Sequence, residues 1–356
     1  MKFESALEVQ AQVFRDVFEY MEVPAAAGMT PLPGLFVDAS AMALEEGVVA
    51  RRAPASSALI DIALGVTEGV GPDDSRLAVL LQDEEALRGD VVGRIVDLAR
   101  DEADVLFIGR QKAAWTQLRN NPLRLGCSAS PTTVGYAGTL GCFCVDVQTG
   151  SVGVLSNNHV LANVNNVPLK TRIMQPGAGD QGRAGRDDVA ELTRFVPIQF
   201  GGIPNAVDAA FATVLKHGRR EDRSTLYDSA NTPAPAIRVV PSSIATAMPG
   251  MFVFKTGRTT RHTRGRVRAV NVNNYNVSLP PFGVARFDNQ ILIEMANNPV
   301  SPFSMPGDSG SLIVDASGQP LGLLFAGSAS GGAGNVGITG CNPISSVVTQ
   351  HGVSLI

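Results

Sequence analysis

Cysteine, histidine and long apolar runs are scarce in this 356-residue chain, and each scarcity excludes a class of protein. The four cysteines are too few and too irregularly spaced for a disulfide framework, and none has a histidine at zinc-site spacing. We therefore expect no metal and no cofactor, and we expect Cys142 and Cys144 to point into a core. No apolar run approaches the length of a membrane span, and a net charge of −4 gives no sign of a nucleic-acid partner.

The N-terminal sequence MKFESALEVQAQVFRDVFEYMEV carries acidic residues where a secretory signal would have an uninterrupted apolar core. We therefore expect a cytoplasmic protein. Apolar residues make up 44% of the chain, which is enough to form cores in two or three compact units.

Residues 1–23 read as an amphipathic helix, because its apolar side chains gather on one face of a helical wheel. That face holds Phe3, Leu7, Phe14, Val17, Phe18 and Met21. A Pro/Ala-rich connecting region, residues 24–57, separates the helix from the next folded part of the chain. The face could pack on its own protein or on another subunit or partner, and the sequence leaves both open.

Residues 58–115 have the texture strand, strand, helix, strand, which predicts a small α/β accessory domain. Acidic residues outnumber basic ones here, so the surface of this domain is either a solvated face or a docking surface for a regulatory partner.

From residue 128 onward the chain consists of short β-type runs punctuated by Gly, Asn, Asp and Pro. This pattern predicts a mainly β fold of antiparallel barrels. The length suffices for two, and we assign the first barrel to residues 128–235 and the second to residues 236–356.

The search for a general base is short, since the histidines are His159, His217, His262 and His351. His159 stands in GVLSNNHVLA, where an apolar strand ends, so its ring could be both oriented and exposed. The other three lie among arginines or near the C-terminus and read as surface or structural residues.

A base that acts on a hydroxyl needs a carboxylate partner and a nucleophile. Asp208 begins an apolar strand in NAVDAAFATV, where a carboxylate has no packing role, whereas Asp187 and Asp188 look like parts of a solvated loop. Ser309 lies in SMPGDSGSLIV, between small residues that open a strand. In this stretch Asp308 is expected to fix the turn.

The order His159, Asp208, Ser309 resembles that of the chymotrypsin and trypsin clan of serine peptidases. The blocks AGTLGCF, LSNNHVLA, FVPIQF, VDAAFA, KTGRTT, GDSGSLIVD and LLFAGS are most similar to an intracellular trypsin-like group that includes the plant narrow-leaf proteins. The resemblance implies a chymotrypsin-like double β-barrel, a serine endopeptidase with this catalytic triad, a protein or peptide substrate and a tendency to form homo-oligomers. The backbone amides of Gly307 and Ser309 would then form the oxyanion hole.

Substrate preference in this clan is set by a pocket near the serine, and here its residues would be Phe303, Ser304, Ala326 and Gly327. None of them is acidic, so we expect a small or apolar residue before the cut and not a basic one.

Three rival interpretations remain. The first is a catalytically latent or inactive peptidase-fold binding or scaffold protein that a partner or assembly switches on, and the second is an esterase. The third is a nucleic-acid site on the basic stretch 254–268, in which Arg264, Arg266 and Arg268 would share one strand face, although the stretch has few aromatic residues for base stacking, with Phe254 its one Phe, Tyr or Trp.

Overall fold

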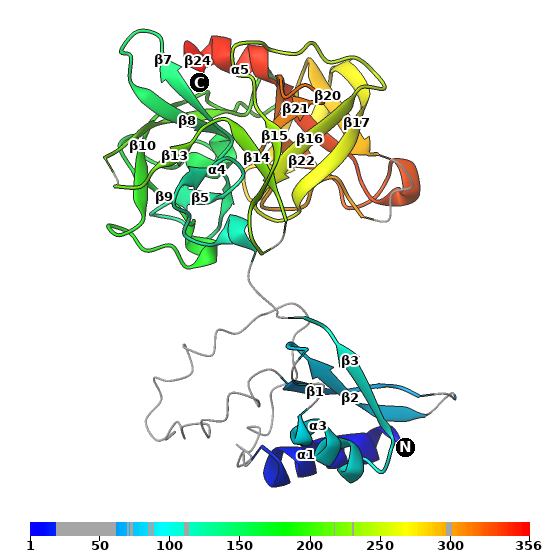
Figure 1. Ribbon diagram of the computed structural model, residues 1–356. Helices are drawn as coiled ribbons and strands as arrows, with labels where there is room; N and C mark the ends of the chain where they lie inside the picture. Colours follow the sequence, from blue (N-terminus) through cyan, green and yellow to red (C-terminus); the bar gives the residue numbers. More distant parts are fainter. Residues whose placement is uncertain are drawn as a thin grey trace. The chain divides into compact units, whose positions relative to one another are not determined.

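The computed structural model describes residues 1–18, 62–69, 71, 74–84, 86, 89–109, 114–216, 218–229, 231–296 and 301–356. The chain forms two compact units, Met1–Lys112 and Ala113–Ile356 (Figure 1). The expected connecting region, residues 24–57, and His217 lie outside the described residues.

The N-terminal unit is a three-stranded sheet in the order β1-β2-β3 with helices α1 and α3 against it (Figure 1). Strand β2 is antiparallel to β1 and parallel to β3. The parallel pair is joined through α3, because parallel neighbours need a crossover connection. This confirms the predicted α/β accessory fold. The bounds are α1 Phe3–Asp16, β1 Ile62–Glu68, β2 Ser75–Leu81, α3 Asp90–Leu98 and β3 Ala103–Phe107.

Helix α1 packs on the sheet of its own unit. Val13 and Val17 are buried in one cluster with Leu77 of β2, which answers the question that the sequence left open. The contact face is rotated from the expected one, because Phe3 and Leu7 are 53% and 42% exposed. Ala6, Val13 and Val17 recur at a spacing that places them in one line along the helix, and Phe3 and Leu7 lie to one side of that line.

The C-terminal unit is mainly β and contains a closed antiparallel barrel beside an eight-stranded sheet that forms a half-barrel (Figure 1). The sheet has the order β24-β7-β8-β12-β10-β9-β5-β6. Its bounds are β5 Ser128–Pro131, β6 Gly138–Thr139, β7 Cys142–Asp146, β8 Val152–Ser156, β9 Arg172–Met174, β10 Asp188–Phe195, β12 Ala210–Val214 and β24 Val353–Leu355. The last strand, β24, therefore joins the sheet that carries the earlier part of the unit.

The closed barrel has the order β16-β17-β20-β23-β22-β21. Its bounds are β16 Phe252–Gly257, β17 Arg261–Val272, β20 Gln290–Met295, β21 Leu312–Asp315, β22 Pro320–Gly327 and β23 Thr339–Pro343. A smaller sheet, β11-β19-β18, pairs two strands of the β17–β20 connection with β11, which lies between β10 and β12 in the chain. Its bounds are β11 Pro204–Asn205, β18 Tyr275–Leu279 and β19 Gly283–Phe287. The remaining elements are β4 Leu123–Arg124, β13 Glu221–Asp222, β14 Thr225–Asp228, β15 Ala234–Arg238, α4 Asn158–Leu161, α5 Ile344–His351 and the 3₁₀ turns Trp115–Gln117, Ala178–Asp180 and Ala333–Asn335.

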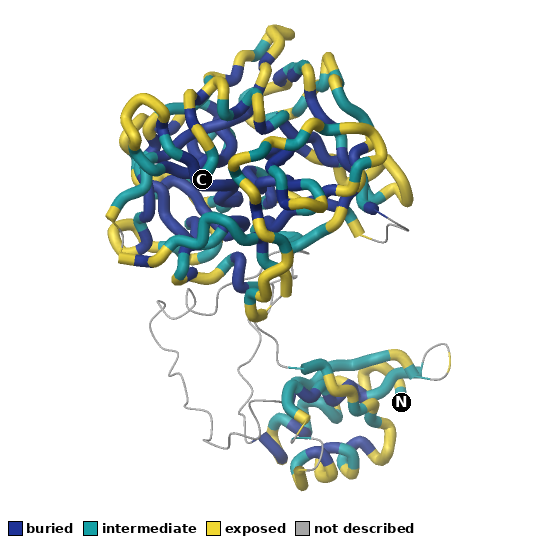
Figure 2. Tube along the Cα trace, turned by 45° about the horizontal axis from the view of Figure 1, so that its top comes forward, coloured by how far each residue is buried: buried dark blue, intermediate teal, exposed yellow. Residues whose placement is uncertain are grey.

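The two β structures share one apolar cluster, in which Phe143 and Leu155 of the sheet pack with Leu312 and Leu323 of the barrel. Figure 2 shows the buried residues of this unit, in dark blue, gathered in its interior. The shared cluster brings the ends of β8 and β21 together. The four cysteines of the chain are free thiols and are buried, which confirms the expectation for Cys142 and Cys144.

Candidate active site

His159 and Asp208 form a hydrogen-bonded pair at the ends of two paired strands. β8 ends at Ser156, and helix α4 begins two residues later, which places His159 in the first turn past the strand. Its Nδ1 lies 2.5 Å from Asp208 Oδ2, and its backbone N–H donates to Asp208 Oδ1 at 3.1 Å. The carboxylate therefore fixes both the ring and the backbone of the histidine.

Two buried asparagine side chains, those of Asn157 and Asn342, bind the backbone of Asp208. The backbone N–H of Asp208 donates to Asn342 Oδ1 at 3.0 Å, and Asn157 Nδ2 donates to the Asp208 carbonyl at 2.8 Å. The Asp208 side chain is 1% exposed, whereas that of His159 is 20% exposed. The histidine thus combines a buried, oriented side with a side that solvent or a substrate can reach.

Ser309 lies in a tight turn ahead of β21, between two glycines with positive φ. Gly307 has φ 97° and Gly310 has φ 96°, a region that favours glycine. A Cβ on Gly310 would lie 2.1 Å from Ser156 Oγ, and one on Gly307 would lie 2.5 Å from Thr259 Oγ1. Both glycines are therefore required by the close approach of the turn to the sheet and to the loop after β16.

Asp308 is buried and fixes this turn, as the sequence suggested. Its carboxylate accepts hydrogen bonds from the backbone N–H groups of Thr259 and Met305, at 2.8 and 2.9 Å, and from Thr260 Oγ1 at 2.6 Å. Lys255 Nζ lies 3.5 Å away, and both side chains are fully buried. Burial lowers the pKa of Lys255 to about 8, while the Asp308 carboxylate acts in the opposite direction.

The peptide groups around Ser309 leave two N–H groups without acceptors. Asp308 N donates to Met305 O, Gly310 N donates to Leu324 O, and Ser311 N donates to Asp308 O. Within the described part of the chain, the N–H groups of Gly307 and Ser309 donate no hydrogen bond.

The carbonyl groups of the same two peptide units accept hydrogen bonds from side chains. Thr259 Oγ1 donates to Pro306 O at 2.8 Å, and Ser311 Oγ donates to Asp308 O at 2.6 Å. In a trans peptide the C=O and the next N–H point in opposite directions. The hydrogen bond to Pro306 O therefore directs the N–H group of Gly307 away from Thr259. The hydrogen bond to Asp308 O likewise directs the N–H group of Ser309 away from the Ser311 hydroxyl.

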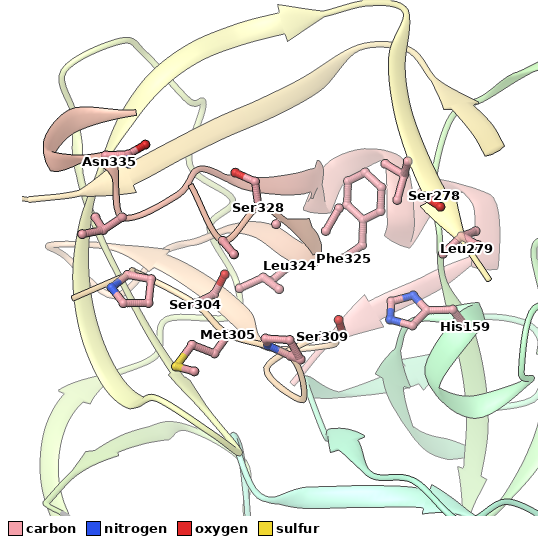
Figure 3. A pocket seen from close by; sticks show the side chains of 17 residues that line it. His159, Ser278, Leu279, Ser304, Met305, Ser309, Leu324, Phe325, Ser328 and Asn335 are labelled. Atoms are coloured by element: carbon pink, nitrogen blue, oxygen red, sulfur yellow. The ribbon is translucent and has the colours of Figure 1, made fainter. Parts of the chain in front are cut away.

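His159 and Ser309 line one pocket of about 640 Å³. In Figure 3 the Ser309 hydroxyl lies on the side of the turn that faces the His159 ring. Among the described residues that line this pocket, His159 is the one with a titratable side chain. The rest of the lining is apolar or neutral, as Leu324, Phe325 and Met305 illustrate (Figure 3).

Of the four residues expected to form a substrate pocket, three line the pocket and one does not. Ser304, Ala326 and Gly327 line the pocket, and Ser304 Oγ lies 2.6 Å from Thr339 Oγ1. Phe303 does not line it. Its side chain is 2% exposed and packs inside the closed barrel, with Lys255 Nζ 5.5 Å from its ring.

For several residues of the site, the sequence gives no indication of their role. Lys255, Thr259 and Thr260 lie in the block KTGRTT, which marks a resemblance without distinguishing any of them. Strand β18 contributes Val277, Ser278 and Leu279 to the pocket, and no motif in the sequence marks these three residues.

The other candidate residues take structural positions. His262 stacks on the ring of Phe254, and burial lowers its pKa. His351 is buried at the end of α5, which fits the structural alternative of the two that the sequence left open. Asp187 is also fully buried, among Arg119, Arg186 and Arg219, and the expectation of a solvated loop was wrong for it. Arginines from distant segments enclose it, which local sequence does not show.

Neither a metal cluster nor a membrane-spanning helix occurs among the residues that the structure describes. Within them, no three His, Cys, Asp or Glu side chains come close enough to hold a metal ion. No helix in the same part of the chain is both long and apolar enough to cross a membrane.

No protein-family model matches the chain, and no curated protein matches its sequence. Three similar solved structures are Thermobifida fusca Protease A, Nocardiopsis protease and Cellulomonas bogoriensis chymotrypsin. Their identities are 16%, 20% and 17%, and their TM-scores are 0.44, 0.45 and 0.44. The matches cover 66%, 65% and 66% of this chain and 98% of each of the others. These proteins are chymotrypsin-like serine proteases.

Proposed function

We propose that the protein is a serine endopeptidase that uses Ser309, His159 and Asp208 as its catalytic triad. The observation that carries the proposal is the convergence of two arrangements on one pocket. The His159–Asp208 pair reaches it from the sheet, and Ser309 reaches it from the barrel with two free N–H groups beside it.

In the proposed reaction His159 takes the Ser309 hydroxyl proton as Ser309 Oγ bonds to the scissile carbonyl carbon. The N–H groups of Gly307 and Ser309 stabilise the resulting oxyanion. His159 then gives the proton to the amine as the C–N bond breaks. Water hydrolyses the acyl-enzyme by the same steps in reverse order, which restores the hydroxyl of Ser309.

The pocket supports an uncharged residue before the cut. Ser304 is 9% exposed, and its hydroxyl is paired with that of Thr339, so it gives a substrate side chain no charge to bind. Leu324 and Ala326 add apolar surface. A lysine, arginine or glutamate side chain would lose its water shell here without gaining an opposite charge, and we infer a preference for small or apolar residues.

We infer an intracellular setting and a relationship to the narrow-leaf group. The motif blocks of the sequence support the relationship, and the four buried free thiols fit a reducing compartment. Assembly into homo-oligomers and a regulatory partner are expectations that the same relationship suggests.

A latent or scaffold protein would be expected to have a collapsed oxyanion region. The free N–H groups of Gly307 and Ser309 and the hydrogen bonds behind them favour a competent site instead.

Digestion of a mixed peptide library tests the proposal, with the new termini read by mass spectrometry. We expect cuts after apolar or small residues with the purified protein and none with Ser309→Ala. Absence of cuts by the folded protein would contradict an active peptidase, and cuts confined to sites after lysine and arginine would contradict the pocket assignment.

A further inference from the structure

Thr139 binds the turn that carries Ser309 at two carbonyl groups. It ends the short strand β6 and is fully buried. Its Oγ1 donates to Gly307 O at 2.8 Å, and its backbone N–H donates to Ser309 O at 2.8 Å. Gly307 and Ser309 are the two residues whose free N–H groups would form the oxyanion hole. Thr139 therefore holds the peptide unit that follows each of them.

The Thr139 hydroxyl has a partner on each side. The backbone N–H of Arg258 donates to Thr139 Oγ1 at 3.0 Å. Because an N–H group can only donate, the hydroxyl proton is left for Gly307 O. A hydroxyl accepts and donates at the same time, whereas the methyl group that valine has in its place does neither.

The hydrogen bond to Gly307 O is important because glycine rotates easily about both of its backbone bonds. Thr259 Oγ1 donates to Pro306 O, which fixes the peptide unit before Gly307. Thr139 Oγ1 donates to Gly307 O, which fixes the peptide unit after it. The direction of the Gly307 N–H therefore depends on both threonines.

The carbonyl group of Thr139 connects the turn to the strand that precedes His159. Ser156 Oγ donates to Thr139 O at 2.7 Å, and Ser156 is the last residue of β8. Tyr136, three residues before Thr139, donates from its hydroxyl to His159 O at 2.9 Å. The segment 136–139 therefore contacts the backbone of both the base and the nucleophile.

Thr139 is close to the pocket without being part of it. It is not among the described residues that line the pocket where His159 and Ser309 meet. Its pairing with Ser128 of β5 would be enough to complete the strand β6. The additional hydrogen bonds end on the turn that carries Ser309, on the loop after β16 and on β8, which are distant from one another in sequence.

We propose that Thr139 is a positioning residue, which directs the oxyanion N–H groups and holds the turn of Ser309 against the strand that leads to His159. This inference rests on the proposed function. Oxyanion donors act mainly when charge develops in the transition state. Their misalignment should therefore lower kcat and leave KM nearly unchanged.

Thr139→Val tests this role, because valine has almost the shape of threonine and lacks the hydroxyl. Gly307 O and the N–H of Arg258 would lose their partner. With an apolar peptide anilide we expect kcat to fall about tenfold, the effect of buried groups left unsatisfied, with KM nearly unchanged. Thr139→Ser restores the hydroxyl and should keep kcat within about twofold of the wild type.

Ser130→Ala is the matched control. The Ser130 hydroxyl is also buried, and it accepts from Ala178 N at 2.9 Å and donates to Pro131 O at 3.2 Å. Its removal should destabilise the protein in urea titrations much as Thr139→Val does, but kcat should stay within about twofold of the wild type. Equal losses of kcat in the two variants would overturn the proposal.

Inhibition by a peptide aldehyde gives a readout that a purely structural residue would not change. The aldehyde adduct of Ser309 resembles the tetrahedral intermediate and uses the same oxyanion donors. In Thr139→Val its inhibition constant should rise by the factor by which kcat/KM falls, and in Ser130→Ala it should not change. A lower kcat with an unchanged inhibition constant would contradict the positioning role.

If Thr139→Val does not fold, Ser156→Ala breaks the hydrogen bond to Thr139 O instead. In this variant kcat should fall about two- to tenfold. A wild-type kcat in a folded Thr139→Val or Ser156→Ala protein would overturn this inference alone. A folded wild type that cleaves no anilide would overturn the proposed peptidase function, and the role of Thr139 with it.

Discussion

His159 Nδ1 lies 2.5 Å from Asp208 Oδ2, and the other oxygen of the same carboxylate accepts the backbone N–H of His159. One buried side chain thus sets both the direction of the imidazole and the position of the backbone that carries it. This arrangement makes Asp208 the partner whose removal should affect the chemistry more than the fold.

Asp208→Asn should lower kcat by about 10⁴, because an amide favours the wrong imidazole tautomer and cannot stabilise the imidazolium. Cleavage of an apolar peptide anilide measures the loss. Asp188→Asn is the matched control, since Asp188 begins the neighbouring strand β10 and accepts one backbone N–H from Gly185. Equal losses in the two variants would contradict the assignment.

The buried Lys255–Asp308 pair should be important for stability. Lys255→Met leaves the Asp308 carboxylate buried without its cation, and we expect the free energy of unfolding to fall by about 3–5 kcal/mol. Urea titration at pH 7 measures it. Adding Asp308→Asn to this variant should recover part of the loss. A Lys255→Met protein as stable as the wild type would show that the pair is unimportant.

Thr259 is predicted to position the oxyanion amide without touching the substrate. Thr259→Val removes the hydroxyl that holds Pro306 O, at a cost of about 0.5–1.5 kcal/mol, so kcat should fall about two- to tenfold with KM nearly unchanged. Thr171→Val removes a similar bond, from Thr171 Oγ1 to Pro168 O, far along the chain. It should leave kcat unaltered. A change confined to KM in Thr259→Val would argue against positioning.

His351 should make the protein less stable in mild acid. Burial, aided by the Arg194 charge, lowers the pKa of His351 to about 4, from 6.5 for an ordinary histidine. Above pH 6.5 its contribution is fully present. As the pH falls toward 4 the unfolded chain takes a proton that the folded protein refuses, so stability drops by up to about 3 kcal/mol.

Urea titrations of wild type and His351→Gln between pH 7 and pH 4.5 check this prediction. The difference in unfolding free energy between the two proteins should shrink as the pH falls. A difference that stays constant across the range would show that His351 is protonated equally in both states.

Much of the fold could be predicted from local pattern. The strand, strand, helix, strand texture indicated the accessory fold, and short apolar runs with turn residues indicated the β architecture. The candidate residues His159 and Ser309 were found because each stands where an apolar run meets small polar residues. Such signals are local, and sequence shows them directly.

Contacts between distant segments were not predictable. Lys255 lies in an apolar strand pattern, and nothing nearby in sequence indicates that it meets Asp308. Phe303 was expected near the pocket because it lies close to Ser309 in sequence, yet its side chain turns into the barrel. Strand β18 lines the pocket as part of a sheet with β19 and β11, and β11 comes from a distant segment of the chain.

The most direct test of the central claim is labelling of the purified protein by a fluorophosphonate probe, which reacts with an activated serine. Circular dichroism should first show that wild type, Ser309→Ala and His159→Ala are folded. We expect the wild type alone to be labelled, with the adduct on Ser309 in the digested protein. Labelling that persists in Ser309→Ala, or a folded wild type that takes no label, would contradict an assembled Ser309 nucleophile.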